Sequence, residues 1–205
     1  MIIERPPKFF RSFFKDVIFR KPESGKKPGT VYITFDDGPI PEATPWILDV
    51  LDSFGVKATF FMVGQNIERF PHIKEDVERR GHRIGNHTLH HLKGPGIDTE
   101  SYLRDAEECR KLTGSDLFRP PHGLITPAQL REIRKVYKVV MFDLVTRDYS
   151  KRVDADEVVG NVKKYARDGS IIVFHDSLKS IHKLKTALPE SLAWLREQGY
   201  EFGLL

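Results

Sequence analysis

Five short segments of the sequence hold residue types that hydrolytic or metal-assisted chemistry requires. They are TFDDGP at 34–39, HTLHH at 87–91, RPPHG at 119–123, RDY at 147–149 and VFHD at 173–176. In the first, Asp36 and Asp37 end an apolar run, where buried charge is costly without a partner or a metal. In the second, His87 and His91 are spaced i, i+4, which on a helical turn would put both imidazoles on one face, as zinc ligation requires.

Each segment also has an ordinary explanation. Asp-Gly-Pro is common turn chemistry, and three histidines within five residues can form a solvated surface. The two prolines after Arg119 force the chain out of a strand, which fits a rigid loop as well as an arginine and backbone amides at the rim of a site. The five segments together indicate a functional site more strongly than any one of them, because all five follow apolar runs that are typical of strands.

Those apolar runs alternate with helical patterns from Thr30 to the end of the chain. The sequence predicts strands at 31–35, 59–63, 83–85, 117–119, 138–142, 170–174 and 201–204, and helices near 45–54, 71–80, 100–112, 127–136, 155–167 and 184–198. Thr126 and Gln129 form a capping box for the fourth helix. This alternation predicts parallel strands with helical crossovers, as an incomplete (β/α) barrel or a doubly wound open sheet. Both bind ligands at the carboxyl ends of their strands, where the five segments would meet.

Together and in this order, the five segments resemble the motifs of the polysaccharide deacetylases, the carbohydrate esterases that share the nodulation-factor deacetylase domain. The resemblance covers the chain from about Thr30 to its end. It implies a distorted (β/α) barrel of about seven parallel strands. It also implies a hydrolase that removes N-acetyl, or alternatively O-acetyl, groups from a carbohydrate such as an N-acetylglucosamine-containing polysaccharide.

The resemblance implies a metal site and a base. By position, Asp37, His87 and His91 would ligate a divalent metal, most simply Zn²⁺, with Co²⁺, Ni²⁺ or Mn²⁺ as alternatives. Asp36 would be the general base, and Arg119 the residue that orients it. The chemistry is consistent, because one carboxylate and two imidazoles leave positions open on the metal for water and a substrate carbonyl.

By the same resemblance, His175 would be the general acid and Asp148 its partner. An imidazole titrates near ~6.5 and can therefore protonate an amine leaving group at neutral pH. The substrate-binding positions implied are Pro121, His122, Tyr149 and Val173. The family usually has Tyr, Trp and Leu at the last three, so these departures bear on the substrate more than on the reaction.

Composition and charge restrict the function further. Cys109 is the only cysteine of the 205 residues, which excludes an intrachain disulfide and a thiolate metal cluster. The net charge of +4 is uneven, since residues 1–29 carry +5 and the remainder −1, so the basic pI gives no support for nucleic-acid binding. No run approaches the ~20 apolar residues of a spanning helix, and residues 1–21 lack the apolar core of a signal peptide. The sequence therefore predicts a cytoplasmic location.

Residues 1–29 are predicted as a basic amphipathic helix and linker that precede a catalytic domain at 30–205. One stripe of this helix would carry Phe9, Phe10, Phe13, Phe14, Val17 and Ile18. The stripe either packs on the barrel or lies on anionic lipid through residues 8–19, which would make the protein peripheral at the membrane. Two alternatives stay open at this point, a deacylase of a lipid-linked sugar and a non-catalytic carbohydrate-binding relative. The oligomeric state is not predicted.

Overall fold

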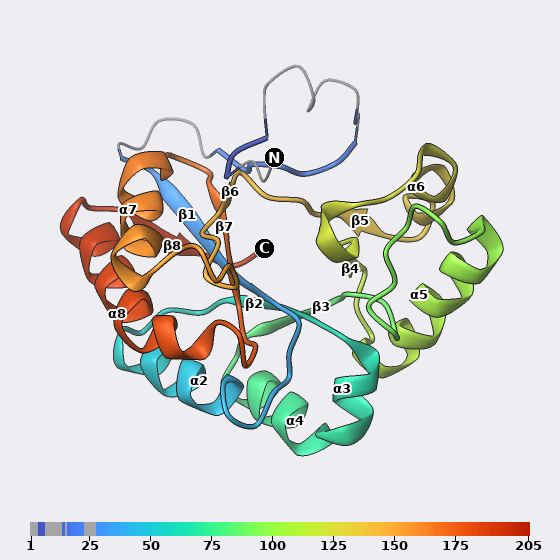
Figure 1. Cartoon of the computed structure of the whole chain (residues 1–205), viewed down its shortest axis with the longest axis horizontal. Helices are drawn as coiled ribbons and strands as arrows, with labels where there is room; N and C mark the ends of the chain where they lie inside the picture. The colour runs from blue at the N-terminus through green and yellow to red at the C-terminus, as the bar shows by residue number, and fades with distance from the viewer. Residues whose placement is uncertain (1–3, 7–13, 15, 23–27) are drawn as a thin grey trace.

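A curled sheet of parallel strands forms the centre of the molecule (Figure 1). The computed structural model describes residues 4–6, 14, 16–22 and 28–205. Neighbouring strands follow the order β5-β4-β3-β2-β1-β7-β6, and β8 pairs with the first half of β1. The strands are β1 (Thr30–Asp36), β2 (Thr59–Met62), β3 (Arg83–Asn86), β4 (Leu117–Phe118), β5 (Lys138–Val139), β6 (Leu144–Val145), β7 (Ile171–His175) and β8 (Glu201–Gly203).

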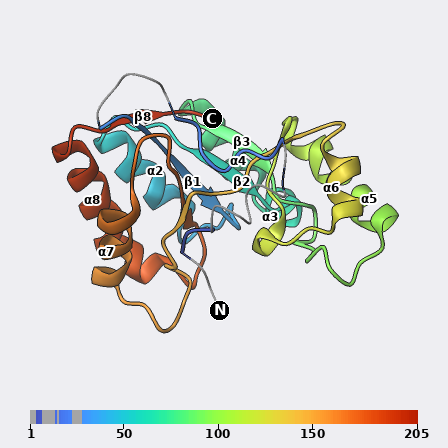
Figure 2. The same ribbon diagram turned by 90° about the horizontal axis from the view of Figure 1, so that it is seen from above.

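Helices pack against the outer face of this sheet. Seen from above, α7 and α8 lie at one side of the molecule and α5 and α6 at the other (Figure 2). The helices are α2 (Thr44–Ser53), α3 (Gly64–Arg69), α4 (Pro71–Arg79), α5 (Thr99–Thr113), α6 (Pro127–Ile133), α7 (Ala155–Tyr165) and α8 (Ile181–Glu197), with a 3₁₀ turn η1 (Pro121–Gly123). The result is a distorted (β/α) half-barrel, as the sequence predicts, and not an open sheet. Among the described residues, no helix is long and apolar enough to cross a membrane.

The side chains of β1 alternate between two environments. Val31, Ile33 and Phe35 face the helices, where Phe35 stacks on Phe60 and Phe174 at centroid distances of 4.9 and 5.8 Å. The alternate side chains, among them Thr34, face the barrel interior, because successive residues of a strand point to opposite faces. Burial of each large apolar side chain stabilises the fold by roughly 1.5–3 kcal/mol. The outer core therefore fixes which residues of β1 point inward.

The described part of the N-terminal segment lies between the two ends of the sheet. Ile18 N donates to Val139 O at 2.9 Å and Met141 N to Ile18 O at 2.8 Å, while Lys21 N donates to Gly169 O at 2.9 Å. Residues 14 and 16–20 are therefore not helical, and for them the predicted amphipathic helix is wrong. Strands at the ends of a sheet carry backbone N–H and C=O groups that lack a partner strand. These groups bond the backbone of the N-terminal segment, which would otherwise form the hydrogen bonds of a helix. Phe9, Phe10 and Phe13 lie outside the described residues.

Most predicted elements are confirmed, including the capping box at Thr126. Two elements are missed: α3, which has six residues, and β6, which has two. The predicted strand at 138–142 is shorter, because beyond Val139 the carbonyls of Val140 and Met141 accept from the Arg119 side chain and not from a neighbouring strand. Short elements carry too little periodicity to be recognised.

Candidate active site

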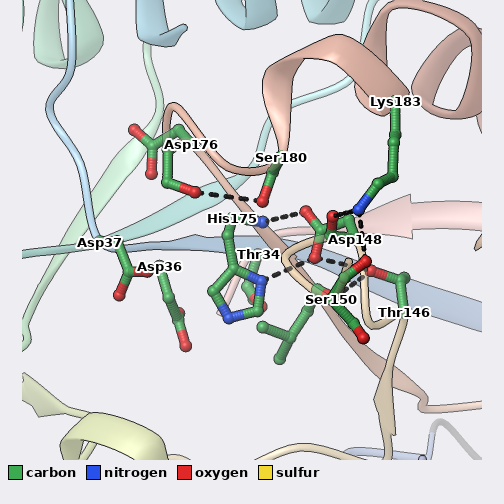
Figure 3. Close-up of polar contacts among 12 residues, drawn as sticks. Thr34, Asp36, Asp37, Thr146, Asp148, Ser150, His175, Asp176, Ser180 and Lys183 are labelled. Atoms are coloured by element: carbon green, nitrogen blue, oxygen red, sulfur yellow. Dashed lines mark hydrogen bonds and ion pairs between the residues drawn. The ribbon is translucent and has the colours of Figure 1, made fainter. Parts of the chain in front are cut away.

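The carboxyl ends of the strands bring the five segments to one face of the barrel. β1 ends at Asp36, β3 at Asn86 and β7 at His175, and Arg119 follows β4 directly. Asp36 and His175 are register partners in adjacent parallel strands, so their side chains start side by side. Figure 3 shows Asp36, Asp37, His175 and Asp148 around this end of the sheet. The predicted convergence is confirmed.

Asp37, His87 and His91 form a compact group of potential metal ligands. One ligand atom from each lies within 4.8 Å of those of the others. Asp37 Oδ1 lies 3.7 Å from His87 Nε2 and 3.1 Å from His91 Nε2. The residues fit a divalent metal, because a carboxylate and two imidazole nitrogens aimed at a common point are the donor set of catalytic zinc sites.

The loop that carries the two histidines is irregular, so the predicted helical turn is wrong. Thr88 and His91 have φ values of 63° and 55°, and Asp37 has a φ of 85°. Non-glycine residues at positive φ cost free energy and persist only where the surroundings hold them, which is typical of functional sites. The imidazoles meet because of this backbone and not because of helical spacing.

The electrostatics of the group also suit a cation. Burial alone would raise the pKa of Asp37, but a hydrogen bond from His91 and the charges of His175 and His87 outweigh it, so the pKa lies well below its usual range. Burial lowers the pKa of His87 to about 4, which keeps this imidazole neutral. His87 Nδ1 is 2.7 Å from the carbonyl of Arg119, which fixes the tautomer with Nε2 as the free lone pair.

Asp36 is held by a fully buried arginine. Arg119 Nη1 donates to Asp36 Oδ1 at 2.6 Å and to Thr34 Oγ1 at 2.9 Å. Its Nε and Nη2 donate to the carbonyls of Val140 and Met141, at 3.2 and 3.0 Å. Because every nitrogen of the planar guanidinium donates a hydrogen bond, the guanidinium is fixed, and it fixes the orientation of the Asp36 carboxylate.

His175 and Asp148 form a second pair, in which Asp148 is buried and His175 is partly exposed. His175 Nδ1 lies 2.8 Å from Asp148 Oδ1, and the backbone N–H of His175 donates to Oδ2 at 2.7 Å. Burial alone would lower the pKa of His175, but the charge and hydrogen bond of Asp148 raise it to about 9. Lys183 Nζ donates to the carbonyls of Asp148 and Ser150 at 2.7 and 2.6 Å, which fixes this loop (Figure 3).

The four predicted substrate-binding residues are placed differently from one another. Pro121 and His122 lie in η1, where His122 is exposed with a φ of 58° and its ring is 4.6 Å from that of His91. Tyr149 packs edge-on against the His175 ring at 4.7 Å. Val173 is 1% exposed and lies within β7 beside Thr34, so it supports the floor of the site.

Three supporting residues were not predicted. Asp105 Oδ1 accepts from the backbone N–H groups of Leu89 and His90, at 2.8 and 3.1 Å, and its Oδ2 lies 2.5 Å from His90 Nδ1. Lys183 holds the Asp148 loop, and Asp176 contacts the turn after Asp37. Asp176 stands in a segment that the sequence singled out. Asp105 and Lys183 lie within helical patterns that carry no such signal.

A curled parallel barrel that brings three potential metal ligands and two carboxylate-containing pairs to one end is typical of hydrolases of the (β/α)-barrel class. Residues 23–140 match the family model described as Polysaccharide deacetylase. The chain is 34% identical over 180 residues to a peptidoglycan-N-acetylglucosamine deacetylase of Bacillus cereus, covering 84% of each protein. It is 32% identical over 175 residues to a chitooligosaccharide deacetylase of Rhizobium leguminosarum bv. trifolii, covering 81% of this chain and 79% of that protein.

Solved structures agree with the sequence comparison. The crystal structure of the Bc1960 peptidoglycan N-acetylglucosamine deacetylase, in complex with a hydroxamate-type benzamide, is similar with a TM-score of 0.87 at 31% identity, covering 98% of this chain and 95% of that one. The chain belongs to the polysaccharide deacetylase family.

Proposed function

We propose that this chain is a metal-dependent deacetylase that removes the N-acetyl group of N-acetylglucosamine residues in a glycan, with Asp36 as base and His175 as acid. The observation that carries the proposal is the placement of two pairs, Asp36 with Arg119 and His175 with Asp148, at adjacent strand ends beside the three ligand candidates. A hydrolysis needs one group to remove a proton and another to deliver one. The two pairs supply these opposite roles.

Asp37, His87 and His91 would hold the metal, with Zn²⁺ the best match to this donor set. The bound ion would supply a Lewis acid that makes water acidic and polarises the acyl carbonyl. Asp36 accepts the proton of the attacking water, since Arg119 keeps its carboxylate oriented. His175 delivers a proton to the amine leaving group, since Asp148 keeps the imidazole protonated at neutral pH.

The turn at η1 supplies a donor for the developing oxyanion. Gly123 N and Leu124 N donate to the carbonyls of Pro120 and Pro121, and Pro121 has no N–H. The backbone N–H of His122 is the remaining donor of this turn. A fixed backbone donor stabilises the transition state without reorganisation.

The proposal is tested by acetate release from N-acetylglucosamine oligomers, measured for the purified chain after chelation and again after Zn²⁺ is restored. We expect activity to disappear with chelator and to return with the metal. Asp36→Asn and His175→Ala should each lower kcat by a factor of about 10² to 10⁴, the usual contribution of a general acid or base. Activity that is indifferent to chelation, or normal turnover by Asp36→Asn, would contradict the proposal.

For the substrate, we propose a glycan that carries carboxylates, as peptidoglycan strands do. Exposed basic side chains stand on loops that follow the site strands: Lys93 after β3, Lys151 and Arg152 after β6, and Lys179 after β7. Burial lowers the pKa of His122, and the charges of Lys93 and Lys179 lower it further, which supports a position of both lysines near the site. A basic rim raises the local concentration of anionic substrates.

Comparison of kcat/KM on peptidoglycan strands and on neutral chito-oligosaccharides tests this preference. The double variant Lys93→Gln/Lys179→Gln should lose activity on the anionic glycan and keep it on the neutral one, and added salt should have the same selective effect. Lys163→Gln, an exposed lysine near the carboxyl end of α7, is the matched control. Equal losses on both substrates would reject the anionic preference.

A further inference from the structure

Asp176 follows the proposed acid His175 directly but takes no part in the chemistry described above. It is 1% exposed, and both of its carboxylate oxygens accept hydrogen bonds from another part of the chain. Oδ1 accepts from the backbone N–H of Gly38 at 2.9 Å, and Oδ2 from Thr44 Oγ1 at 2.6 Å. Figure 3 shows its side chain directed away from the His175 ring. The carboxylate therefore faces the turn after Asp37.

Contact between Asp176 and this turn is close enough to determine the residue at position 38. A Cβ on Gly38 would lie 1.8 Å from Asp176 Oδ2 and 2.4 Å from its Cγ, so only glycine permits the approach. The backbone N–H of Asp176 also donates to the carbonyl of Asp36 at 3.1 Å. Two hydrogen bonds thus join the exit of β7 to the exit of β1, beyond the last paired residues Asp36 and His175.

Thr44 extends this contact around the whole turn. Its hydroxyl accepts from the backbone N–H of Ile40 at 2.8 Å and donates to Asp176. The backbone from Gly38 to Thr44 is therefore organised around one buried carboxylate. Immediately before it stands Asp37, at the positive φ of 85°. A non-glycine residue in this conformation needs neighbours that hold it.

Keeping a carboxylate at this position is costly. Burial and the nearby charge of Asp37 raise the pKa of Asp176, and the hydrogen bonds from Thr44 and Gly38 oppose this rise. A buried charge persists only where its hydrogen bonds are satisfied. The two donors and the glycine that admits them have one shared effect, which is to fix the turn that carries Asp37.

We propose that Asp176 is a positioning residue for the metal ligand Asp37, holding its carboxylate at the point where His87 and His91 meet. The proposal rests on the proposed metal-dependent function. Residues that orient ligands from behind typically contribute 10–100-fold to metal affinity. Asp176→Asn keeps the shape but places an NH₂ group against one of the two donors, Gly38 N–H or the Thr44 hydroxyl.

The test is the affinity of the full chain for Zn²⁺, titrated against a chelating indicator, with unfolding temperature measured alongside. Asp176→Asn should raise the Kd for Zn²⁺ by about 10–100-fold and lower kcat with little change in KM. The matched control is Asp143→Asn, the same change in a carboxylate with no exposed surface that binds Arg167 and Ser170 at the opposite, amino-terminal end of β6 and β7. It should lower the unfolding temperature and leave the Zn²⁺ affinity unchanged.

Asp176→Asn with a Kd within twofold of the unmodified chain would overturn the proposal. If this variant does not fold, Thr44→Val decides the matter, since it removes one donor and keeps the carboxylate: a Kd raised at least threefold supports the role, and an unchanged Kd rejects it. Asp37→Ala distinguishes a failure of the positioning role of Asp176 from a failure of the proposed metal site. Should the unmodified chain bind Zn²⁺ no better than Asp37→Ala does, the proposed metal site itself is wrong.

Discussion

Arg119 and Asp36 form an ion pair from which water is almost excluded. Nη1 of the arginine lies 2.6 Å from Oδ1 of the aspartate, and the two residues are 1% and 6% exposed. The guanidinium also lies over the Phe61 ring, with its central carbon 4.0 Å from the ring centroid. Because the carbonyl of Arg119 also meets His87, one residue of the β4 end orients both the proposed base and a metal ligand.

Arg119→Leu should therefore cost stability as well as activity. Removal of one partner of a buried pair leaves an uncompensated charge, and we expect the free energy of unfolding to fall by about 3–5 kcal/mol. Urea denaturation at neutral pH measures this change. Arg104→Leu is the control, since Arg104 pairs with Glu100 on the exposed face of α5 and should lose less than about 1 kcal/mol. Equal losses of unfolding free energy in the two variants would show that the Arg119–Asp36 pair contributes no more to stability than an exposed ion pair.

His90 and His91 are adjacent in the sequence but belong to different parts of the structure. His91 Nε2 faces Asp37, whereas His90 Nδ1 contacts Asp105 at the back of the loop. His91→Ala should weaken Zn²⁺ binding by more than about 100-fold, beyond the range of outer supporting groups, while His90→Ala should weaken it far less. Calorimetric titration with Zn²⁺ measures both. The assignment of ligands is wrong if His90→Ala proves the more damaging change.

Strand ends were the part of the fold that the sequence predicted best. Long apolar runs such as that of β1 are unambiguous, and the residues that follow them must meet at one face once the strands are parallel. Asp36, Asp37 and His175 were found in this way. Val173 shows the limit, since a position inside such a run was assigned to substrate binding and is buried.

Contacts that depend on the tertiary fold could not be predicted. Asp105 is one acidic residue among several on α5, and its role follows only from the loop that packs on it. Ile18 belongs to a pattern that suits an amphipathic helix, yet its backbone pairs beside Val140 because the sheet offers free groups there. Tertiary hydrogen bonds override local propensity in such segments.

The pKa of His175, raised to about 9, predicts the alkaline side of the pH profile. The proposed acid works only when protonated, so kcat/KM should fall as the pH rises through about 9. Asp148→Asn removes the charge that raises this pKa, and the midpoint of the fall should move toward the ordinary histidine value of ~6.5. Tyr149→Phe keeps the ring beside His175 and should leave the midpoint in place. A profile that is the same in all three proteins would assign the fall to another group.

His82 predicts an acid sensitivity of folding that is separate from catalysis. It is 6% exposed at the start of β3, where Nδ1 accepts from the backbone N–H of Ala58 at 3.1 Å and the ring packs edge-on against Phe60. Burial lowers its pKa to about 4 from an ordinary value of 6.5, with a further contribution from the charge of Lys57. Between these two values the unfolded chain binds the extra proton, so stability falls as the pH is lowered from about 6.5 to about 4.

His82→Asn tests this origin, because its side-chain oxygen can accept from Ala58 N–H without titrating. The loss of unfolding free energy between pH 6.5 and pH 4 should be smaller in this variant than in the unmodified chain, by up to about 3 kcal/mol. His72→Asn, at an exposed position of α4, should follow the unmodified chain across the same range. Denaturant unfolding at a series of pH values gives all three curves. Parallel curves for His82→Asn and the unmodified chain would mean that His82 accepts its proton in the folded state, and that its burial does not keep it neutral.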